Sequence, residues 1–248
     1  EDAARELNAP FFHALDSTRP WVTLKLAISL DGAVADAHGA SRWITGVESR
    51  RETHRLRAGH DAVAVGIGTV LADDPALTVR TVPSPRVPPR RVVFDRQARL
   101  PIDSVLVRTA DDVPTVVVCH AADSRRIDAL RDSHVDIVDA PTLEAALVSL
   151  RAMGIRSLLA EGGARLAGSL LGNALVDRLV IFQAPVLLGG GALSAFAYVP
   201  PGKVDQARRL AVITRRRLGD DVMTVYRASD PRPTDADCSP DSSTTSER

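Results

Sequence analysis

Two segments of this sequence combine charged side chains with small residues in patterns typical of a ligand site. In the first, Trp21 to Leu30, apolar residues at every second position predict a strand with one face toward the core. The opposite face carries Lys25, a cation and hydrogen-bond donor, and Ala27, which leaves room for a flat ring. This face is either the wall of a cleft or the solvated side of an edge strand, and alternation alone does not decide between them.

The second segment is SLLAEGGARLAGSLL, in which a hydrophobic strand ends near Glu161 and an amphipathic helix begins near Ala164. The two glycines between them leave backbone N–H groups uncovered at a helix N-terminus, an arrangement that binds anions at the carboxyl end of a parallel strand. The same residues also fit an ordinary tight turn. Glu161 is the notable residue, because a carboxylate beside an anion site usually has a second task.

The segment VGIGTVLADDP fails as a dinucleotide-binding fingerprint, because Leu71 occupies the position of the third glycine. In the DDP sequence that follows, Asp73 fits a turn that caps the backbone. Arg57 and Arg80 flank this region. Each could bind a phosphate through its forked guanidinium, or could be solvated surface.

Short runs rich in Val, Ile and Leu alternate with helical stretches along the chain, which predicts an α/β fold with a mostly parallel sheet and an antiparallel C-terminal hairpin. Thr45 and Glu48 match a capping box at the start of the first long helix. The expected helices are 47–58, 123–132, 142–153 and 164–173. The expected strands are 22–30, 61–66, 90–95, 104–107, 115–119, 135–138, 157–161, 177–185, 211–218 and 222–227.

Composition excludes several classes of protein. The 248 residues carry 31 basic and 31 acidic side chains, so no net charge attracts nucleic acid or a membrane surface. Two cysteines cannot build a zinc ribbon or a disulfide framework, and no metal site is expected. We expect a cytoplasmic enzyme in three parts: an N-terminal linker or short helix (1–19), one catalytic domain (20–228) and a disordered tail (229–248).

Read together, the motifs WVTLKLAISLDGAVA, SRWITG, VGIGTVLADDPALTVR, AEGGARLAGSLL and APVLLGG resemble one known family. It is the reductase domain of the bifunctional riboflavin-biosynthesis deaminase/reductase, and the resemblance runs from about Pro20 to Tyr226. It implies a three-layer dihydrofolate-reductase-like fold with flanking helices. It also implies NADPH-dependent reduction of 5-amino-6-(5-phospho-D-ribosylamino)uracil to the ribitylamino compound, and a homodimer.

The resemblance also implies roles for individual residues. Positions that match the family's cofactor site are Ala27, Trp43, Thr69, Asp73, Gly163, Ala164, Arg165, Leu166, Ala167, Gly168 and Ser169. Positions that match its substrate site are Ser41, Arg57, Leu77, Arg80 and Glu161. We assign the 2′-phosphate of NADP to Arg96, with His120 as the second choice. We expect Lys25, Asp73 and Glu161 to act in catalysis, with Lys25 or Asp73 moving protons during ring opening.

One departure from the family is large. The deaminase half needs H-x-E and P-C-x-x-C motifs to hold zinc, and neither occurs in this sequence. Deamination is therefore not expected of this chain, and a deaminase domain or chain remains a possible partner. Two alternatives stay open: a dihydrofolate or pterin reductase of the same fold, and a non-catalytic nucleotide-binding partner of a separate deaminase.

Overall fold

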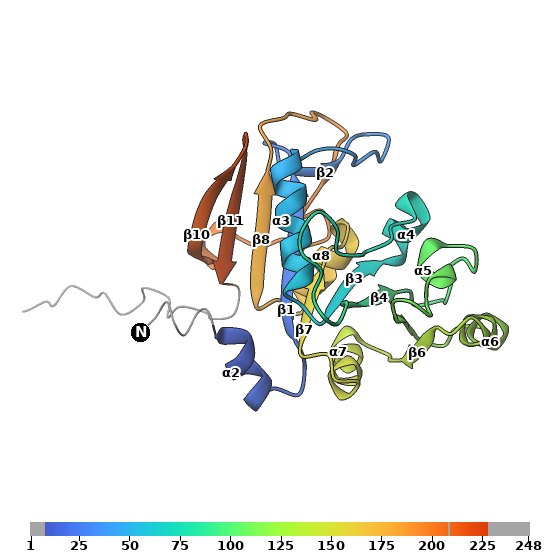
Figure 1. Cartoon of the computed structure of the whole chain (residues 1–248). Coiled ribbons are helices and arrows are strands. Elements are labelled where there is room, and N and C mark those ends of the chain that lie inside the picture. Colours follow the sequence, from blue (N-terminus) through green and yellow to red (C-terminus); the bar gives the residue numbers. More distant parts are fainter. Residues whose placement is uncertain (1–7, 208, 228–248) are drawn as a thin grey trace, which may run out of the picture.

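A nine-stranded sheet runs through the centre of the molecule (Figure 1), in a computed structural model that describes residues 8–207 and 209–227. The strand order is β10-β11-β8-β1-β7-β3-β4-β5-β6. Every neighbouring pair from β8 to β6 is parallel, whereas β11 pairs antiparallel with both β8 and β10. The sheet strands are β1 (Trp21–Ile28), β3 (Ala62–Gly66), β4 (Arg90–Phe94), β5 (Thr115–Cys119), β6 (Asp136–Asp139), β7 (Ser157–Ala160), β8 (Arg178–Gln183), β10 (Ala211–Leu218) and β11 (Asp221–Arg227). The expected fold class is confirmed.

Helices cover both faces of this sheet. On one face, α7 and α8 pack leucines and alanines against the even-numbered residues of β1. On the other face, α4, α5 and α6 pack against β3, β4 and β5, and α3 packs on β8 and β11. The helices are α2 (Ala9–Asp16), α3 (Val47–Ala58), α4 (Ile67–Asp73), α5 (Val105–Arg108), α6 (Ser124–Asp132), α7 (Leu143–Ala152) and α8 (Ala164–Gly172). A small two-stranded sheet, β2 (Ala33–Ala35) and β9 (Leu193–Ser194), and a 3₁₀ turn at Val204–Gln206 complete the described elements.

The position of β1 decides between the two interpretations of its polar face. Because β1 lies between β7 and β8, it is an interior strand, and the edge-strand interpretation is wrong. Thr23 and Ser29 on that face are as buried as the leucines opposite, so both faces are covered. The parallel register pairs Leu24 of β1 with Ala160 of β7. The next residue along each segment, Lys25 after Leu24 and Glu161 after Ala160, therefore lies at the same level of the sheet.

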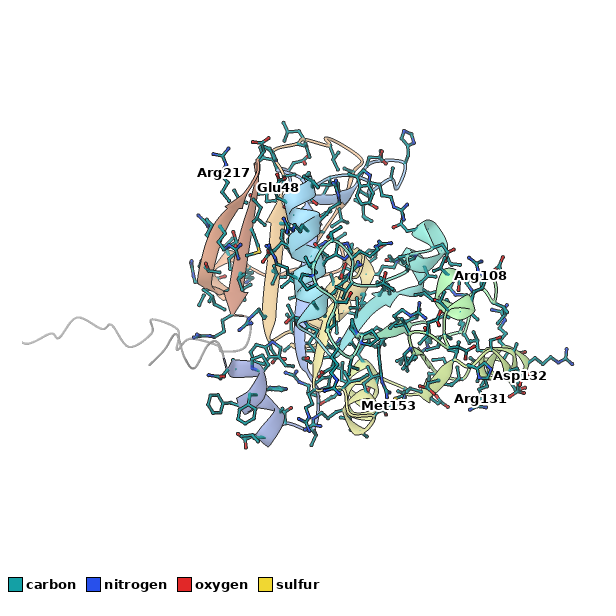
Figure 2. The ribbon with its side chains drawn as sticks, viewed as in Figure 1. Glu48, Arg108, Arg131, Asp132, Met153 and Arg217 are labelled. Carbon is teal, nitrogen blue, oxygen red and sulfur yellow. The ribbon has the colours of Figure 1, made fainter. Side chains whose placement is uncertain are left out.

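The N-terminus of α3 is capped differently from the sequence prediction. Gly46 is the N-cap residue and no side chain of the α3 segment caps it, so the capping box is wrong. Instead, the buried Asp221 of β11 accepts hydrogen bonds from the Gly46 N–H (2.7 Å) and the Ser49 hydroxyl (2.5 Å). Figure 2 shows Glu48 beside the β10–β11 hairpin, where its carboxylate lies against the turn. Because Asp221 is 175 residues from Gly46 in the chain, the sequence around the start of α3 gives no indication of this cap.

Two helices were not anticipated. The run at 104–107 is not a strand but the start of α5, because a short apolar run does not distinguish a buried strand from a buried helical turn. Asp74 initiates that helix by accepting the Val105 N–H at 2.9 Å. The segment that failed as a dinucleotide fingerprint forms α4, which follows β3 directly with Gly66 as its N-cap.

Some expectations fall partly outside the described residues. The predicted disordered tail, 229–248, lies outside them, as do residues 1–7 of the predicted linker. Within that linker the described part forms α2, which is tied to α7 by a hydrogen bond from Arg151 Nη2 to the Ala14 carbonyl at 2.9 Å.

Candidate active site

A cavity of about 860 Å³ opens at the carboxyl ends of β1, β3 and β7. This is the end of a parallel sheet at which ligands of α/β proteins bind. The cavity gathers side chains from β1, α3, α4 and the loops around them. Among the residues proposed for the site, those that line it are Lys25, Ala27, Ser41, Trp43, Arg57, Thr69, Asp73, Leu77, Arg80, Glu161 and Gly163.

Three charged side chains meet in its wall. Arg57 of α3 binds Glu161, which follows β7, through two parallel hydrogen bonds: Nε to Oε1 at 2.6 Å and Nη2 to Oε2 at 2.9 Å. Both side chains are about nine-tenths buried, with 12% of Arg57 and 10% of Glu161 exposed. Lys25 of β1 lies alongside, its Nζ 5.5 Å from the centre of the Phe182 ring.

These neighbours set the charge states. Burial lowers the pKa of Lys25; the carboxylate of Glu161 opposes that effect and the Arg57 guanidinium adds to it. For Glu161, burial acts to raise the pKa, but the Arg57 guanidinium outweighs it and the net pKa is lowered. Because Arg57 donates two hydrogen bonds to the Glu161 carboxylate, Glu161 is an ionised acceptor. Its negative charge is shared between Arg57 and Lys25. The result is an amine prone to lose its proton beside a firmly ionised carboxylate.

The glycine segment places the start of a helix beside the cavity. Gly163 is the N-cap of α8, and a Cβ added there would meet only Thr69 Oγ1, at 3.9 Å. Gly163 is exposed and lines the cavity, so the backbone at this helix start is accessible to a ligand there. Further along α8, Ala164, Leu166, Ala167 and Gly168 are buried in the packing of the domain, so these residues support the helix start from inside.

The rim of the cavity carries an aromatic ring between cations. Trp43 is 70% exposed, with Arg50 of α3 at 4.6 Å and Arg42 at 5.8 Å from its ring. Arg42 also reaches across to Asp73, through Nη2 to its carbonyl at 2.8 Å and Nε to its carboxylate at 3.3 Å. The Asp73 carboxylate is thus paired with the Arg42 guanidinium.

The two residues proposed for the 2′-phosphate lie outside the cavity lining. Arg96 and His120 follow β4 and β5 and are joined by a backbone hydrogen bond at 3.0 Å. The His120 ring pairs with Asp139 at 2.9 Å. They remain at the carboxyl end of the sheet, one and two strands beyond β3. Arg165 points elsewhere, over the ring of Tyr198 at 5.0 Å.

Sequence reasoning missed several polar residues of the cavity lining, among them Arg42, Arg50 and His54. His54 lies on α3 one turn before Arg57 and lines the cavity, where its Nδ1 accepts the backbone N–H of Arg80 at 3.1 Å. The signal was available: residues 50, 54 and 57 are polar at helical spacing and so share one face of the helix.

Neither a metal nor a membrane is indicated for the described residues. No group of three or more His, Cys, Asp or Glu side chains in 8–207 and 209–227 could hold a metal ion. None of the helices described in these ranges is long and apolar enough to cross a membrane.

Comparisons with known proteins identify the family. The family model described as the RibD C-terminal domain matches residues 20–223. The chain belongs to the RibD C-terminal domain family. It is 38% identical over 229 residues to the riboflavin biosynthesis protein RibD of Aquifex aeolicus, covering 92% of this chain and 63% of that protein. This confirms the resemblance and shows that the chain spans less than two thirds of that RibD relative.

A shorter relative is matched over nearly its whole length. The 2,5-diamino-6-ribosylamino-4(3H)-pyrimidinone 5′-phosphate reductase of Methanothermobacter thermautotrophicus is 40% identical over 217 residues, covering 84% of this chain and 98% of that protein. Among solved structures, RibD of Acinetobacter baumannii superimposes with a TM-score of 0.80 at 31% identity, over 92% of this chain and 63% of that one. The similarity to RibD therefore extends to the three-dimensional fold.

Proposed function

We propose that this chain catalyses the NADPH-dependent reduction of 5-amino-6-(5-phospho-D-ribosylamino)uracil to 5-amino-6-(5-phospho-D-ribitylamino)uracil. The observation that carries the proposal is the single cavity that joins the Lys25–Glu161–Arg57 cluster to the open helix start at Gly163. The name of the Methanothermobacter relative supports a ribosylamino-pyrimidine 5′-phosphate as the substrate class.

The residues present fit a reduced dinucleotide. The cavity falls within the range of about 300–1,000 Å³ usual for small-molecule sites. The start of α8 at Gly163 suits a diphosphate, and Ala27 and Thr69 line the cavity with small side chains that leave space for the rest of the dinucleotide. Arg96 remains our candidate for the 2′-phosphate, on the strands beyond β3. When bound, NADPH would supply the hydride that C1′ of the substrate accepts.

In this proposal the chain's own side chains orient the substrate and move protons. Ring opening of the ribosylamine transfers a proton from the glycosidic nitrogen to the ring oxygen and leaves an imine at C1′. After hydride addition at C1′, the nitrogen takes up one proton. Lys25 Nζ suits these transfers, because it lines the cavity and its lowered pKa makes its ammonium a stronger acid than that of an exposed lysine. We therefore favour Lys25 over Asp73, whose carboxylate is paired with the Arg42 guanidinium.

Recognition would be divided between the base and the phosphate. The ionised Glu161 accepts hydrogen bonds from the pyrimidine N–H groups. Arg80 binds the 5′-phosphate. Arg57 uses three of its five N–H groups inside the protein, two on Glu161 and one on the Thr78 carbonyl at 2.9 Å, so its contribution to the phosphate is secondary. Ser41 and Leu77 complete the substrate side of the cavity.

The test is loss of NADPH absorbance with the aminouracil phosphate as the only other substrate, run in parallel with dihydrofolate. We expect turnover with the aminouracil phosphate alone. Arg80→Ala should raise KM for this substrate roughly tenfold and leave KM for NADPH within about twofold, because a charged hydrogen bond is worth about 1.5–3 kcal/mol. Turnover of dihydrofolate instead, or of neither compound, would refute the proposal.

We propose in addition that the enzyme is a cytoplasmic homodimer and that the partner reaction, deamination, is supplied by a separate domain or chain. The support for a dimer is the free edge of β10, which pairs only with β11 among the described strands and exposes Val212 at 54%. Exposed edges of this kind tend to pair with another chain. Sedimentation analysis should give twice the monomer mass, and Val212→Lys should lower that mass.

A further inference from the structure

The segment 75–89 leads from α4 to β4, and its first part, which includes Leu77, Arg80 and Thr81, lines the cavity. It contains no helix or strand, and none of the backbone–backbone hydrogen bonds of the described residues joins it. Two of its residues, Leu77 (φ 52°) and Thr81 (φ 62°), adopt the left-handed region that non-glycine residues avoid. Such conformations persist only where surrounding contacts impose them.

Leu77 is held by its burial in the core formed with α4 and α5, and the stretch that follows it is held by side chains of α3. Arg57 Nη1 donates to the Thr78 carbonyl at 2.9 Å, and His54 Nδ1 accepts the Arg80 N–H at 3.1 Å. The two α3 side chains are one helical turn apart, so together they hold both ends of the Thr78–Arg80 stretch between the two left-handed residues. The side chain that this stretch presents to the cavity is that of Arg80.

The hydrogen bond to Arg80 requires a neutral imidazole with its proton on Nε2, because a protonated ring has no lone pair on Nδ1. The surroundings favour that state. Burial lowers the pKa of His54, and the cations Arg57 and Arg80 lower it further; Glu161 and a hydrogen bond with the Thr78 backbone act in the other direction, and the net pKa is lowered. His54 is therefore an acceptor at neutral pH, with the cations of Arg57 and Arg80 nearby.

We propose that His54 is a positioning residue for substrate binding: its Nδ1 fixes the Arg80 backbone, and thereby sets the guanidinium of Arg80 where it meets the substrate's 5′-phosphate. This inference rests on the proposed function, in which Arg80 binds that phosphate. His54 itself touches neither the hydride donor nor the reacting carbon. Its removal therefore affects recognition of the phosphate and leaves the chemical step intact.

The first test compares two substitutions of the same residue. His54→Leu removes the acceptor, whereas His54→Asn keeps one, because the Asn Oδ1 occupies nearly the place of the histidine Nδ1. We expect His54→Leu to raise KM for the phosphorylated substrate about tenfold, with kcat and KM for NADPH within about twofold. His54→Asn should stay within about threefold of the wild type. The exposed His134, replaced by Asn, is the control for loss of an imidazole.

A double-mutant cycle shows whether the effect passes through Arg80. In an Arg80→Ala background, His54→Leu should change KM by less than about twofold, because the group that it positions is gone. An equal loss with and without Arg80, or an unchanged KM in His54→Leu alone, would overturn the inference. Calorimetric binding of ribose 5-phosphate should rank the variants in the same order. If the wild type binds this phosphate but does not reduce the aminouracil, the proposed function fails while this inference stands.

Amide hydrogen exchange tests the contact in the wild-type protein, so the outcome does not depend on whether the leucine variant folds. The Arg80 amide should be protected relative to that of Arg86, which lies in the same segment without a hydrogen bond among the described residues. Equal exchange at the two amides would show that His54 does not hold Arg80.

Discussion

Replacing Arg57 with methionine tests the electrostatics of the cavity most severely. The change removes two hydrogen bonds to Glu161, at 2.6 and 2.9 Å, and one to the Thr78 carbonyl, at 2.9 Å, and it leaves the Glu161 carboxylate about nine-tenths buried without its partner. Breaking a buried pair in this way typically costs about 3–5 kcal/mol. We expect the lower end, about 3 kcal/mol, because the cavity gives Glu161 access to water.

This loss is measurable by urea and thermal unfolding. For a domain of this size, about 3 kcal/mol corresponds to a fall in Tm of roughly 6–12 °C. The double variant Arg57→Met/Glu161→Met should recover part of the loss, because the unpaired carboxylate is gone, whereas Lys25 has lost its neighbouring carboxylate and the Thr78 carbonyl its donor. A single variant that loses less than about 1 kcal/mol, or a double variant less stable than Arg57→Met alone, would refute the reasoning.

The deficit should also depend on pH. In the wild type, Arg57 lowers the pKa of Glu161, so the pair's contribution is present above the ordinary glutamate range and is lost as pH falls through the lowered value. In Arg57→Met that lowering is absent, so Glu161 protonates at higher pH and its burial cost disappears. The difference in unfolding free energy between the two proteins is therefore largest at neutral pH and shrinks in acid.

Two further predictions concern packing and the lysine. Gly168→Ala should destabilise the domain by about 1–3 kcal/mol in urea unfolding, because the added Cβ would lie 2.5 Å from Tyr198 Cβ and 2.6 Å from the Tyr198 backbone. Gly68→Ala is the control, since a Cβ added there would meet nothing within 4 Å. An equal loss of stability in the two variants would contradict this packing. Lys25 and Lys203 are the only lysines in the sequence, so mass spectrometry after mild acylation reports each separately. The acylation rate of Lys25 should rise at lower pH than that of a lysine in an unfolded peptide, because burial lowers its pKa; a midpoint at or above the peptide's would count against its proposed role.

Local pattern was enough to predict most of the framework. The alternation in β1, the buried valine runs and the hairpin around Gly219 appear in the structure where they were expected, and α3 spans the predicted residues. What failed depended on distant partners. The cap of α3 comes from Asp221, and the apolar run at 104–107 becomes helical where Asp74 accepts its first N–H.

The site shows the same division. The sequence placed Lys25 on the polar face of a strand and Glu161 at a strand end, and the parallel register of β1 and β7 brings them to the same level of the sheet. Nothing local indicated that Arg57 would commit its guanidinium to Glu161, because that contact joins residues 104 positions apart. His54 was overlooked for a related reason. Its side chain accepts the backbone N–H of Arg80, which belongs to a loop without regular structure, so no sequence pattern predicts the contact.

The most direct test of this account is the crystal structure of the protein with NADP⁺ bound. We predict that the diphosphate lies on the backbone N–H groups at the start of α8, with the nicotinamide ring beside Ala27 and within reach of Lys25. A dinucleotide located outside the cavity, or one whose nicotinamide lies away from β1, would contradict the account.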